Sequence, residues 1–179
     1  MTRRDVRFVQ LAMEEAKKSS VCMQHGCIAV MHGKIIARSF NTACRASPTV
    51  WWSCHAEMAA IKKINEPEQC RQRHRRQRIT LYVARLTHGE LHSSAPCFHC
   101  MRAIQLCPYI KRIIYSEADG SITRCSPHEF CTQHVSWGLR DMRQRHVRAG
   151  RCVPPQTPPL LNYAVLARRA VPWKPGFPD

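Results

Sequence analysis

The sequence predicts an α/β fold, in which a mixed central β-sheet has helices packed on its faces, followed by a basic, proline-rich C-terminal tail. Helical and strand-like segments alternate between residues 5 and 116, and this alternation favours the layered architecture. A length of 179 residues suits one domain with a proper core better than two. The periodic pattern fades beyond about residue 123. We therefore predict a domain at residues 1–124 and an extension at residues 125–179.

The first predicted element is a surface helix from Asp5 to Ser19. Its apolar residues recur at helical spacing, and charged residues fill the other face. The apolar positions are Val6, Val9, Met13 and Ala16, and the charged positions are Glu14, Glu15, Lys17 and Lys18. This pattern indicates one buried stripe.

A hairpin and a loop are predicted next. Residues 27–31 and 34–38 are typical of two strands, because both are apolar and the pair His32-Gly33 between them suits a tight turn. Residues 41–53 are predicted to be a loop broken by Pro48.

A second helix and a third strand follow. Residues 56–64 suit a helix, for which Ser53 lies near the expected capping position. Residues 67–78 are polar and rich in arginine, and residues 79–83 are apolar enough for a strand. The sequence thus predicts an arginine-rich insertion between helix and strand.

The last predicted elements are a third helix and a fourth strand. Residues 87–95 form a polar connection, after which Pro96 is well placed to open a helix that runs to about Leu106. Residues 112–116 are typical of a further strand.

Two short motifs, Cys54-His55-Ala56-Glu57 and Pro96-Cys97-Phe98-His99-Cys100, together offer one imidazole, two thiolates and a carboxylate. Zinc takes nitrogen and sulfur ligands in a tetrahedron, and a catalytic zinc site has three protein ligands with water in the fourth position. Cys97 and Cys100 lie one turn apart at a helix start, which favours their thiolate forms. The motifs thus predict Zn²⁺ bound by His55, Cys97 and Cys100.

The remaining polar residues of the motifs are assigned by their position. Glu57 is too close in sequence to His55 to share its role easily, so its carboxylate is free to reach a metal-bound water. Adjacency to His55 likewise disfavours Cys54 as a fourth ligand. On a helix His99 points away from both thiols, which predicts that it is exposed or lies outside the ligand set. A closed structural zinc site, or buried thiols beside a core histidine, is the alternative interpretation.

These motifs resemble the zinc-dependent cytidine and deoxycytidylate deaminase-like family, whose signature pairs H-x-E with P-C-x-x-C. The resemblance covers roughly residues 5–123, including the strand entry His25-Gly26-Cys27 and the strand Leu81-Tyr82-Val83. It implies the three-layer cytidine deaminase-like fold, with helices on both faces of the sheet. It also implies pairing of subunits around the site.

The same resemblance implies the chemistry of the site. Glu57 is expected to act as general acid and base, taking the proton of a zinc-activated water whose hydroxide attacks a ring carbon that bears an amino group. Asn41 and Ala56 are expected to contact the substrate. The implied reaction is therefore hydrolytic deamination.

Two segments depart from the family pattern. Family members usually pass almost directly from the Leu-Tyr-Val strand into P-C-x-x-C, whereas residues 85–95 intervene here. The arginine-rich insertion also lengthens the link between the second helix and that strand. Both segments flank the expected pocket, so the resemblance does not specify the substrate.

The chain is strongly basic, because 28 Lys and Arg residues against 12 Asp and Glu residues give a formal net charge of +16. This charge indicates a polyanionic partner, and the clusters at residues 71–78 and 140–151 are candidates for contact with phosphate or nucleic acid. A merely solvated basic surface is the alternative. Trp51 and Trp52 are expected either to pack against the helix start or to stack on a base.

Cysteine usage indicates the compartment. Eleven cysteines at irregular spacing, and no apolar stretch after Met1, predict a reducing intracellular compartment, either cytoplasm or nucleus. No apolar run is long enough to span a bilayer, so no membrane partner is expected. His128, Cys131 and His134 recur at three-residue intervals, which is compatible with a second metal site or with chance.

These observations favour an enzyme that deaminates a cytosine-type nucleoside or nucleotide, with deoxycytidylate as the nearest family analogy. A deaminase of single-stranded DNA or of RNA is the second hypothesis, motivated by the charge and the two tryptophans. A third hypothesis belongs to another class of protein. In it, a non-catalytic deaminase-like chain binds nucleic acid or serves in assembly, and zinc is kept for folding.

Overall fold

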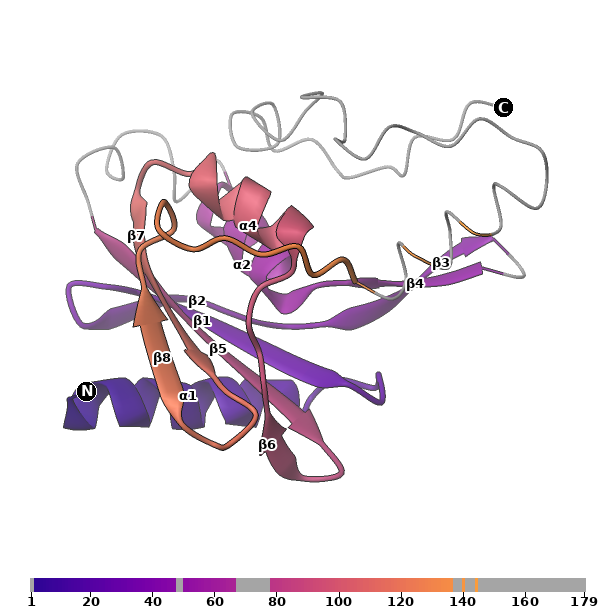
Figure 1. The fold of residues 1–179 in the computed structure, drawn as a ribbon, viewed down its shortest axis with the longest axis horizontal. Coiled ribbons are helices and arrows are strands. Elements are labelled where there is room, and N and C mark those ends of the chain that lie inside the picture. The colour runs from indigo at the N-terminus through magenta and orange to yellow at the C-terminus, as the bar shows by residue number, and fades with distance from the viewer. Residues whose placement is uncertain (1, 48–49, 67–77, 137–139, 141–143, 145–179) are drawn as a thin grey trace.

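The main sheet of the protein is mixed, as the sequence predicts. A computed structural model describes residues 2–47, 50–66, 78–136, 140 and 144 (Figure 1). The strands of the sheet follow the order β2-β1-β5-β7-β8, and β6 pairs with β5. β7 runs parallel to β5, whereas the pairs β1/β2, β1/β5, β5/β6 and β7/β8 are antiparallel. Their bounds are β1 Gln24–Met31, β2 Lys34–Phe40, β5 Ile79–Thr87, β6 Glu90–His92, β7 Ile110–Ser116 and β8 Ile122–Cys125.

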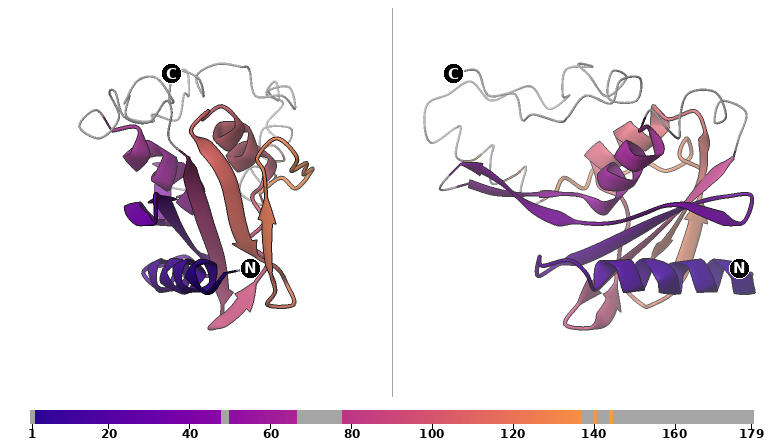
Figure 2. Two further views of the ribbon diagram at one scale, coloured as in Figure 1. Left: turned by 90° about the vertical axis from the view of Figure 1, so that its left-hand side faces the viewer. Right: turned by 180° about the vertical axis from the view of Figure 1, so that it is seen from behind.

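Helices cover both faces of this sheet, so the predicted three-layer architecture is confirmed. Helix α1 (Arg3–Ala16) lies on one face, and helices α2 (Ala56–Ile64) and α4 (Phe98–Gln105) lie on the other (Figures 1 and 2). Within the described part of the chain, no helix is long and apolar enough to cross a membrane.

Helix α1 begins two residues before the predicted start, because Thr2 caps it. The hydroxyl of Thr2 accepts the backbone N–H of Asp5 at 3.2 Å, and the Asp5 carboxylate accepts the Thr2 N–H at 3.1 Å. These reciprocal bonds form a capping box. They satisfy backbone donors that the helix itself leaves unpaired.

The stripe predicted for α1 is partly wrong. Val6 is 37% exposed, whereas Phe8 and Ala12 are buried in its place. Glu15, assigned to the solvent face, is also buried, and its carboxylate accepts from Lys18 at 2.8 Å and lies 3.4 Å from Arg38 on β2. The ion pairs explain how an acidic residue is accommodated on the buried side.

Gly26 allows α1 to approach β1 closely. A Cβ atom at this position would overlap the carbonyl oxygen of Ala12 and lie 2.5 Å from the backbone nitrogen of Ala16. Both alanines are fully buried. The small residues therefore place helix backbone directly on strand backbone.

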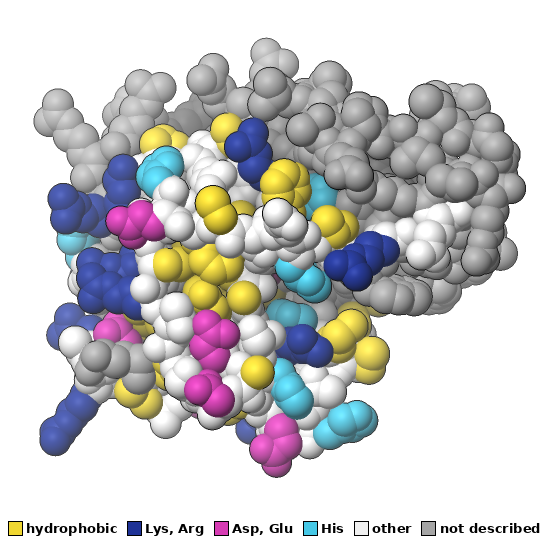
Figure 3. Space-filling view, viewed as in Figure 1, with side chains coloured by type: hydrophobic (Ala, Val, Ile, Leu, Met, Phe, Trp, Pro, Cys, Tyr) yellow, Lys and Arg dark blue, Asp and Glu magenta, His cyan; other side chains and the backbone are white. Residues whose placement is uncertain are grey.

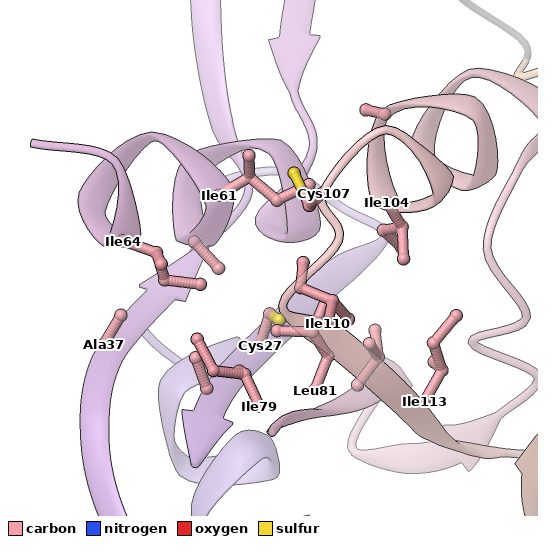
Figure 4. Close-up of a cluster of buried hydrophobic side chains, with 14 of the residues drawn as sticks. Cys27, Ala37, Ile61, Ile64, Ile79, Leu81, Ile104, Cys107, Ile110 and Ile113 are labelled. Atoms are coloured by element: carbon pink, nitrogen blue, oxygen red, sulfur yellow. The ribbon is translucent and has the colours of Figure 1, made fainter. Parts of the chain in front are cut away.

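The larger core fills the space between the sheet and helices α2 and α4 (Figure 4). Ile61 and Ile64 of α2 and Ile104 of α4 meet Leu81 of β5 and Ile113 of β7. Alternate residues of β5 face the opposite way, where Tyr82 and Ala84 pack with Phe8 and Val9 of α1. The central strand is thus buried on both sides.

The loop predicted at residues 41–53 is wrong. Strands β3 (Thr42–Ser47) and β4 (Val50–Cys54) pair with each other in a separate antiparallel ribbon. The proline that suggested a loop falls between them, at residues 48–49, which lie outside the described residues. The ribbon leads from the end of β2 directly into α2 (Figure 1).

The connection predicted at residues 87–95 also contains a strand. β5 continues four residues past its predicted end, turns at His88-Gly89 and returns as β6. Both turn residues have positive φ values, 52° and 85°, as a tight hairpin requires. The hydroxyl of Ser94 then bonds to the carbonyl of Val83 at 2.8 Å and to Ser116 of β7. Residues 85–95, which family members usually lack, therefore contribute to the sheet through the end of β5 and through β6.

The chain beyond β7 continues to pack on the domain for some distance. β8 was not predicted. After it, the carbonyl of Pro127 accepts from the Gln105 side chain at 2.9 Å, and the ring of Phe130 lies 5.6 Å from that of Tyr115. The predicted domain boundary at residue 124 stays a prediction. The arginine-rich insertion, most of the basic stretch at 140–151 and the proline-rich tail lie outside the described residues.

Candidate metal centre

The candidate metal ligands lie at the starts of two helices on the same face of the sheet. His55 is the N-cap residue of α2, with extended backbone torsions, and follows β4 directly. Cys97 is the N-cap residue of α4, and Cys100 lies in its first turn. The predicted capping by Ser53 and helix start at Pro96 are therefore each wrong by two residues. The helices still bring the two motifs together, although 42 residues separate His55 from Cys97.

The geometry of these three side chains fits a zinc ion. Nδ1 of His55 lies 3.2 Å from Sγ of Cys100 and 3.5 Å from Sγ of Cys97. Tetrahedral zinc with its usual bond lengths places nitrogen and sulfur ligands about 3.6 Å apart. Among the described residues, these are the three whose ligand atoms all lie within 4.8 Å of one another. Three nitrogen and sulfur donors leave one tetrahedral position for another ligand.

The electrostatics of the cluster favour a cation between the thiols. The hydrogen bond from Cys100, together with His55, lowers the pKa of Cys97 to about 2. The same bond and complete burial raise the pKa of Cys100. Burial lowers the pKa of His55, but contacts with Cys97 and Glu57 outweigh it and raise that pKa to about 9. Thiolate ligands and a neutral imidazole are the forms that bind zinc.

Glu57 lies beside the ligands without joining them. It occupies the first turn of α2 and is only 3% exposed. Burial raises the pKa of its carboxyl, the His55 charge lowers it, and a side-chain hydrogen bond links it to Cys100. A buried carboxyl that stands outside the ligand set, with its pKa raised, can accept and return a proton.

Of the two alternatives predicted for His99, exposure or a place outside the ligand set, only the second holds. It is half-buried rather than exposed, and its side chain hydrogen-bonds to Cys97, which helps to lower the pKa of that thiol. The helix starts only at Phe98, so the two residues are not separated by regular helical geometry. His99 thus supports the ligand set from outside, which was the second part of the prediction. Cys54 is not in the ligand group, and its thiol lies 3.8 Å from the carbonyl of His55.

The two residues predicted to contact substrate are buried next to this centre. Asn41 follows β2, and its side-chain amide accepts the His25 backbone N–H at 2.7 Å and donates to the Met23 carbonyl at 2.8 Å. Ala56 opens α2, and its carbonyl accepts from the Ser39 hydroxyl at 2.9 Å. Their role toward a substrate stays a prediction.

Sequence reasoning did not single out His25 as part of the site. Its ring is close enough to His55 and Cys97 for both to act on its pKa, which burial lowers to about 4. Nδ1 donates to the Met23 carbonyl at 3.1 Å, so the neutral ring presents Nε2 as an acceptor. Its place opposite the end of β5 could have been found only from strand pairing.

Other predicted features do not join the centre. The group His128, Cys131 and His134 is not among the metal-binding clusters of the described residues. The backbones of Trp51 and Trp52 belong to β4, while their side chains lie outside what the structure describes.

The α/β fold and the His-Cys-Cys site define a zinc-binding protein of the hydrolase type. A family model described as the zinc-binding region of cytidine and deoxycytidylate deaminases matches residues 2–117. The match spans more than half of the chain. The chain belongs to the cytidine and deoxycytidylate deaminase family.

One solved structure supports this fold, and two further structures match it more weakly. A cytidine deaminase from Burkholderia pseudomallei superposes with a TM-score of 0.54 at 16% identity, covering 75% of this chain and all of the other. A dCMP deaminase from the cyanophage S-TIM5 in apo form gives a TM-score of 0.47 at 20% identity, covering 66% and 86%. The same enzyme with dCMP and dUMP gives 0.45 at 17% identity, covering 63% and 81%. A search of curated proteins gives no significant match.

Proposed function

We propose that the protein catalyses the zinc-dependent hydrolytic deamination of a cytosine-type nucleoside or nucleotide, with a deoxycytidylate-like substrate. The burial of Glu57 against the set His55, Cys97 and Cys100 carries this proposal. A purely structural zinc site gives no reason to bury a carboxylate beside an incomplete ligand set, because its desolvation costs free energy.

The residues of the chain supply the proton chemistry. Bound zinc would provide a water molecule of lowered pKa at the open position. The carboxylate of Glu57 would accept a proton from the attacking water, whose oxygen would form a bond to C4 of the ring. The carboxyl then protonates ring atom N3, receives the second proton of the water and passes it to the amino group. The C4–N bond breaks, ammonia leaves and C4 keeps the oxygen as a carbonyl.

Substrate binding is assigned to Asn41 and Ala56. Both are buried beside the centre, and Ser39 and the start of β1 hold them in place. Fixed polar groups of this kind orient a ring without reorganising during the reaction. Subunit pairing remains part of the same proposal.

A polynucleotide substrate is the second candidate, and the net charge of +16 favours it. In that case free nucleosides and nucleotides are poor substrates, and single-stranded DNA or RNA is deaminated. A third outcome, binding of nucleic acid with no turnover of any substrate, would show that the chain is a non-catalytic scaffold.

One experiment separates these functions. Zinc-loaded protein is incubated with cytosine and adenine nucleosides, their nucleotides and single-stranded oligonucleotides, and ammonia is measured. Glu57→Gln is expected to lower the rate about 10²- to 10⁴-fold while zinc content is kept. Glu14→Gln, a change at an exposed glutamate of α1, is the matched control and should have no effect. Ammonia release that survives Glu57→Gln would refute the assigned role.

A further inference from the structure

Arg85 of the β5–β6 hairpin lies in a row between two histidines on the face that carries the metal centre. Arg85 of β5 pairs directly with His25 of β1 on one side and with His92 of β6 on the other. Directly paired residues of antiparallel strands project from the same face of a sheet, about 5 Å apart. The row lies two residues along each strand from Cys27 and Val83, which belong to the core under α2 and α4.

The row lies next to the metal centre. His55 and Cys97 are both close enough to His25 to act on its pKa, and so is Arg85. Asn41 fixes the backbone at the start of β1 through its bonds to Met23 and His25. The guanidinium is therefore held at the edge of the site assigned to the reacting ring.

Arg85 lacks the partners that a half-buried guanidinium normally has. Within the described residues, the ion pairs are those of Glu15 with Lys18 and Arg38, far from this row on the other face. Arg85 donates to the thioether sulfur of Met23 at 3.3 Å, which is a weak acceptor. Its Nε is buried and has no hydrogen-bond partner among the described residues. An unsatisfied buried donor of this kind costs stability unless a ligand satisfies it.

A second unsatisfied donor lies beside it. The hydroxyl of Thr87 is also buried without a partner in the described part of the chain. Thr87 is two residues beyond Arg85 on β5, so both side chains project from the same face, roughly 7 Å apart at their backbones. The turn of the hairpin holds both strands in register. A guanidinium and a hydroxyl at this spacing can bind one anion.

Figure 3 shows several histidine side chains on the lower part of the molecule, with both Lys or Arg and Asp or Glu side chains among them. Two histidines flank Arg85 in the sheet, and the acidic Glu90 of β6 pairs with Thr87, one step further from the metal centre. A planar guanidinium with free donors is well suited to the oxygens of phosphate.

We propose that Arg85, with Thr87 beside it, binds a phosphate group of the substrate. The inference rests on the proposed function and narrows it. The substrate carries a phosphate, either as the monoester of a free nucleotide or as the diester of a polynucleotide, and the unphosphorylated nucleoside binds poorly.

Binding of the reaction products tests this assignment without requiring turnover. Calorimetry with zinc-loaded protein is expected to show deoxyuridylate, or an oligonucleotide that contains one deoxyuridine, binding at least about 10-fold more tightly than deoxyuridine. Arg85→Gln should weaken phosphorylated ligands about 10- to 100-fold and leave deoxyuridine unchanged. Arg85→Lys should restore part of the loss, and Thr87→Val should cost a few-fold. Arg7→Gln on α1 makes the same charge change at an exposed site and should have no effect.

The ligand arms identify the source of the phosphate. Loss confined to deoxyuridylate assigns a monoester, and loss confined to the oligonucleotide assigns a diester; both support the inference. Equal affinity for deoxyuridine and both phosphorylated ligands, or no change on Arg85→Gln in a variant that melts like the unmodified protein, would overturn it. If no substrate is deaminated while Arg85-dependent binding persists, the proposed function fails and the phosphate site stands. If deamination occurs and is unchanged by Arg85→Gln, the proposed function stands and the phosphate site fails.

Discussion

The two faces of the sheet are built on different principles. On the face covered by α1, small residues bring backbone onto backbone, with Gly26 against Ala12 and Ala16. On the face covered by α2 and α4, the same strands lead from an isoleucine-rich core to buried polar groups, among them Ser39 and Glu57. The first face leaves no room for an added atom at Gly26, and the second buries a carboxyl beside the candidate metal ligands, where its desolvation is unfavourable.

This difference separates stability from chemistry. Burial of apolar surface stabilises a fold, whereas an incomplete ligand set and a buried carboxyl are kept at a cost that their chemistry explains. Changes under α1 should therefore alter the free energy of unfolding and leave zinc binding intact in the folded fraction. Changes to the buried polar groups and ligands under α2 and α4 should alter zinc content or turnover more than stability.

Removal of a ligand thiol should have the largest effect on the second face. Cys100→Ala leaves two ligands, so zinc content is expected to fall from about one ion per chain to near zero, and deamination with it. Elemental analysis of the purified protein measures this, with circular dichroism to follow the fold. Cys22→Ala, a change at an exposed thiol, is the control. Full zinc content in Cys100→Ala would show that the ion is held elsewhere.

An added methyl group at Gly26 should have the largest effect on the first face. Its Cβ would overlap Ala12, and both neighbours are backbone atoms that cannot rotate away. Gly26→Ala is expected to lower the free energy of unfolding by about 3 kcal/mol. Urea denaturation measures this. At Gly120, where nothing lies within 4 Å, alanine should cost only about 1 kcal/mol, from its positive φ. Equal costs at the two glycines would contradict the close-packing argument.

Sequence reasoning predicted the parts of this comparison that depend on local patterns. The H-x-E and P-C-x-x-C motifs identify the zinc site because ligand type and spacing are chemical requirements. The hairpin turn at His32-Gly33 is confirmed by its positive φ values. The second helix begins at Ala56 as predicted, whereas the starts of α1 and α4 were each wrong by two residues, because capping by Thr2 or by Cys97 depends on how the chain enters the helix.

Features set by strand pairing could not be predicted. β6 is three residues long and polar, and it forms only because β5 offers it an edge. The row around Arg85 exists only in the register of three strands, so nothing in the spacing of His25, Arg85 and His92 indicates it. The burial of Glu15 depends likewise on Arg38 of β2, which is distant in sequence.

Asp5, one of two buried acidic residues of α1, should have a moderate, pH-dependent effect. Burial raises the pKa of Asp5, but bonds from Thr2 and Tyr82 outweigh it and lower that pKa. The folded pKa thus lies below the unfolded value of about 3.9. The stabilisation is present above that pH and is lost as the pH falls through the folded pKa.

Asp5→Asn is therefore expected to lower the free energy of unfolding by about 1–2 kcal/mol at pH 7. As the pH falls from about 4 through the lower folded pKa, the difference from the unmodified protein should shrink, because the carboxyl of the folded protein then becomes protonated. Denaturation between pH 3 and pH 7 measures this, with the exposed Glu14→Gln as control. Zinc content should not change, and a loss of zinc would show that the two faces are coupled.

The smallest effect is expected at Ser39, which connects the sheet to the metal centre. Its hydroxyl lies 3.1 Å from the Cys27 carbonyl and 2.9 Å from the carbonyl of Ala56, one residue from His55. Ser39→Ala should cost about 1 kcal/mol of stability, whereas Ser20→Ala at an exposed position should cost nothing measurable. Because the bond fixes the start of α2, zinc affinity measured against a chelator should also fall, by about 10-fold. A loss of stability with unchanged zinc affinity would show that Ser39 contributes to packing alone. Stability and zinc binding would then not be separated by the two faces of the sheet, because β2 would carry a packing residue on the face of the metal centre.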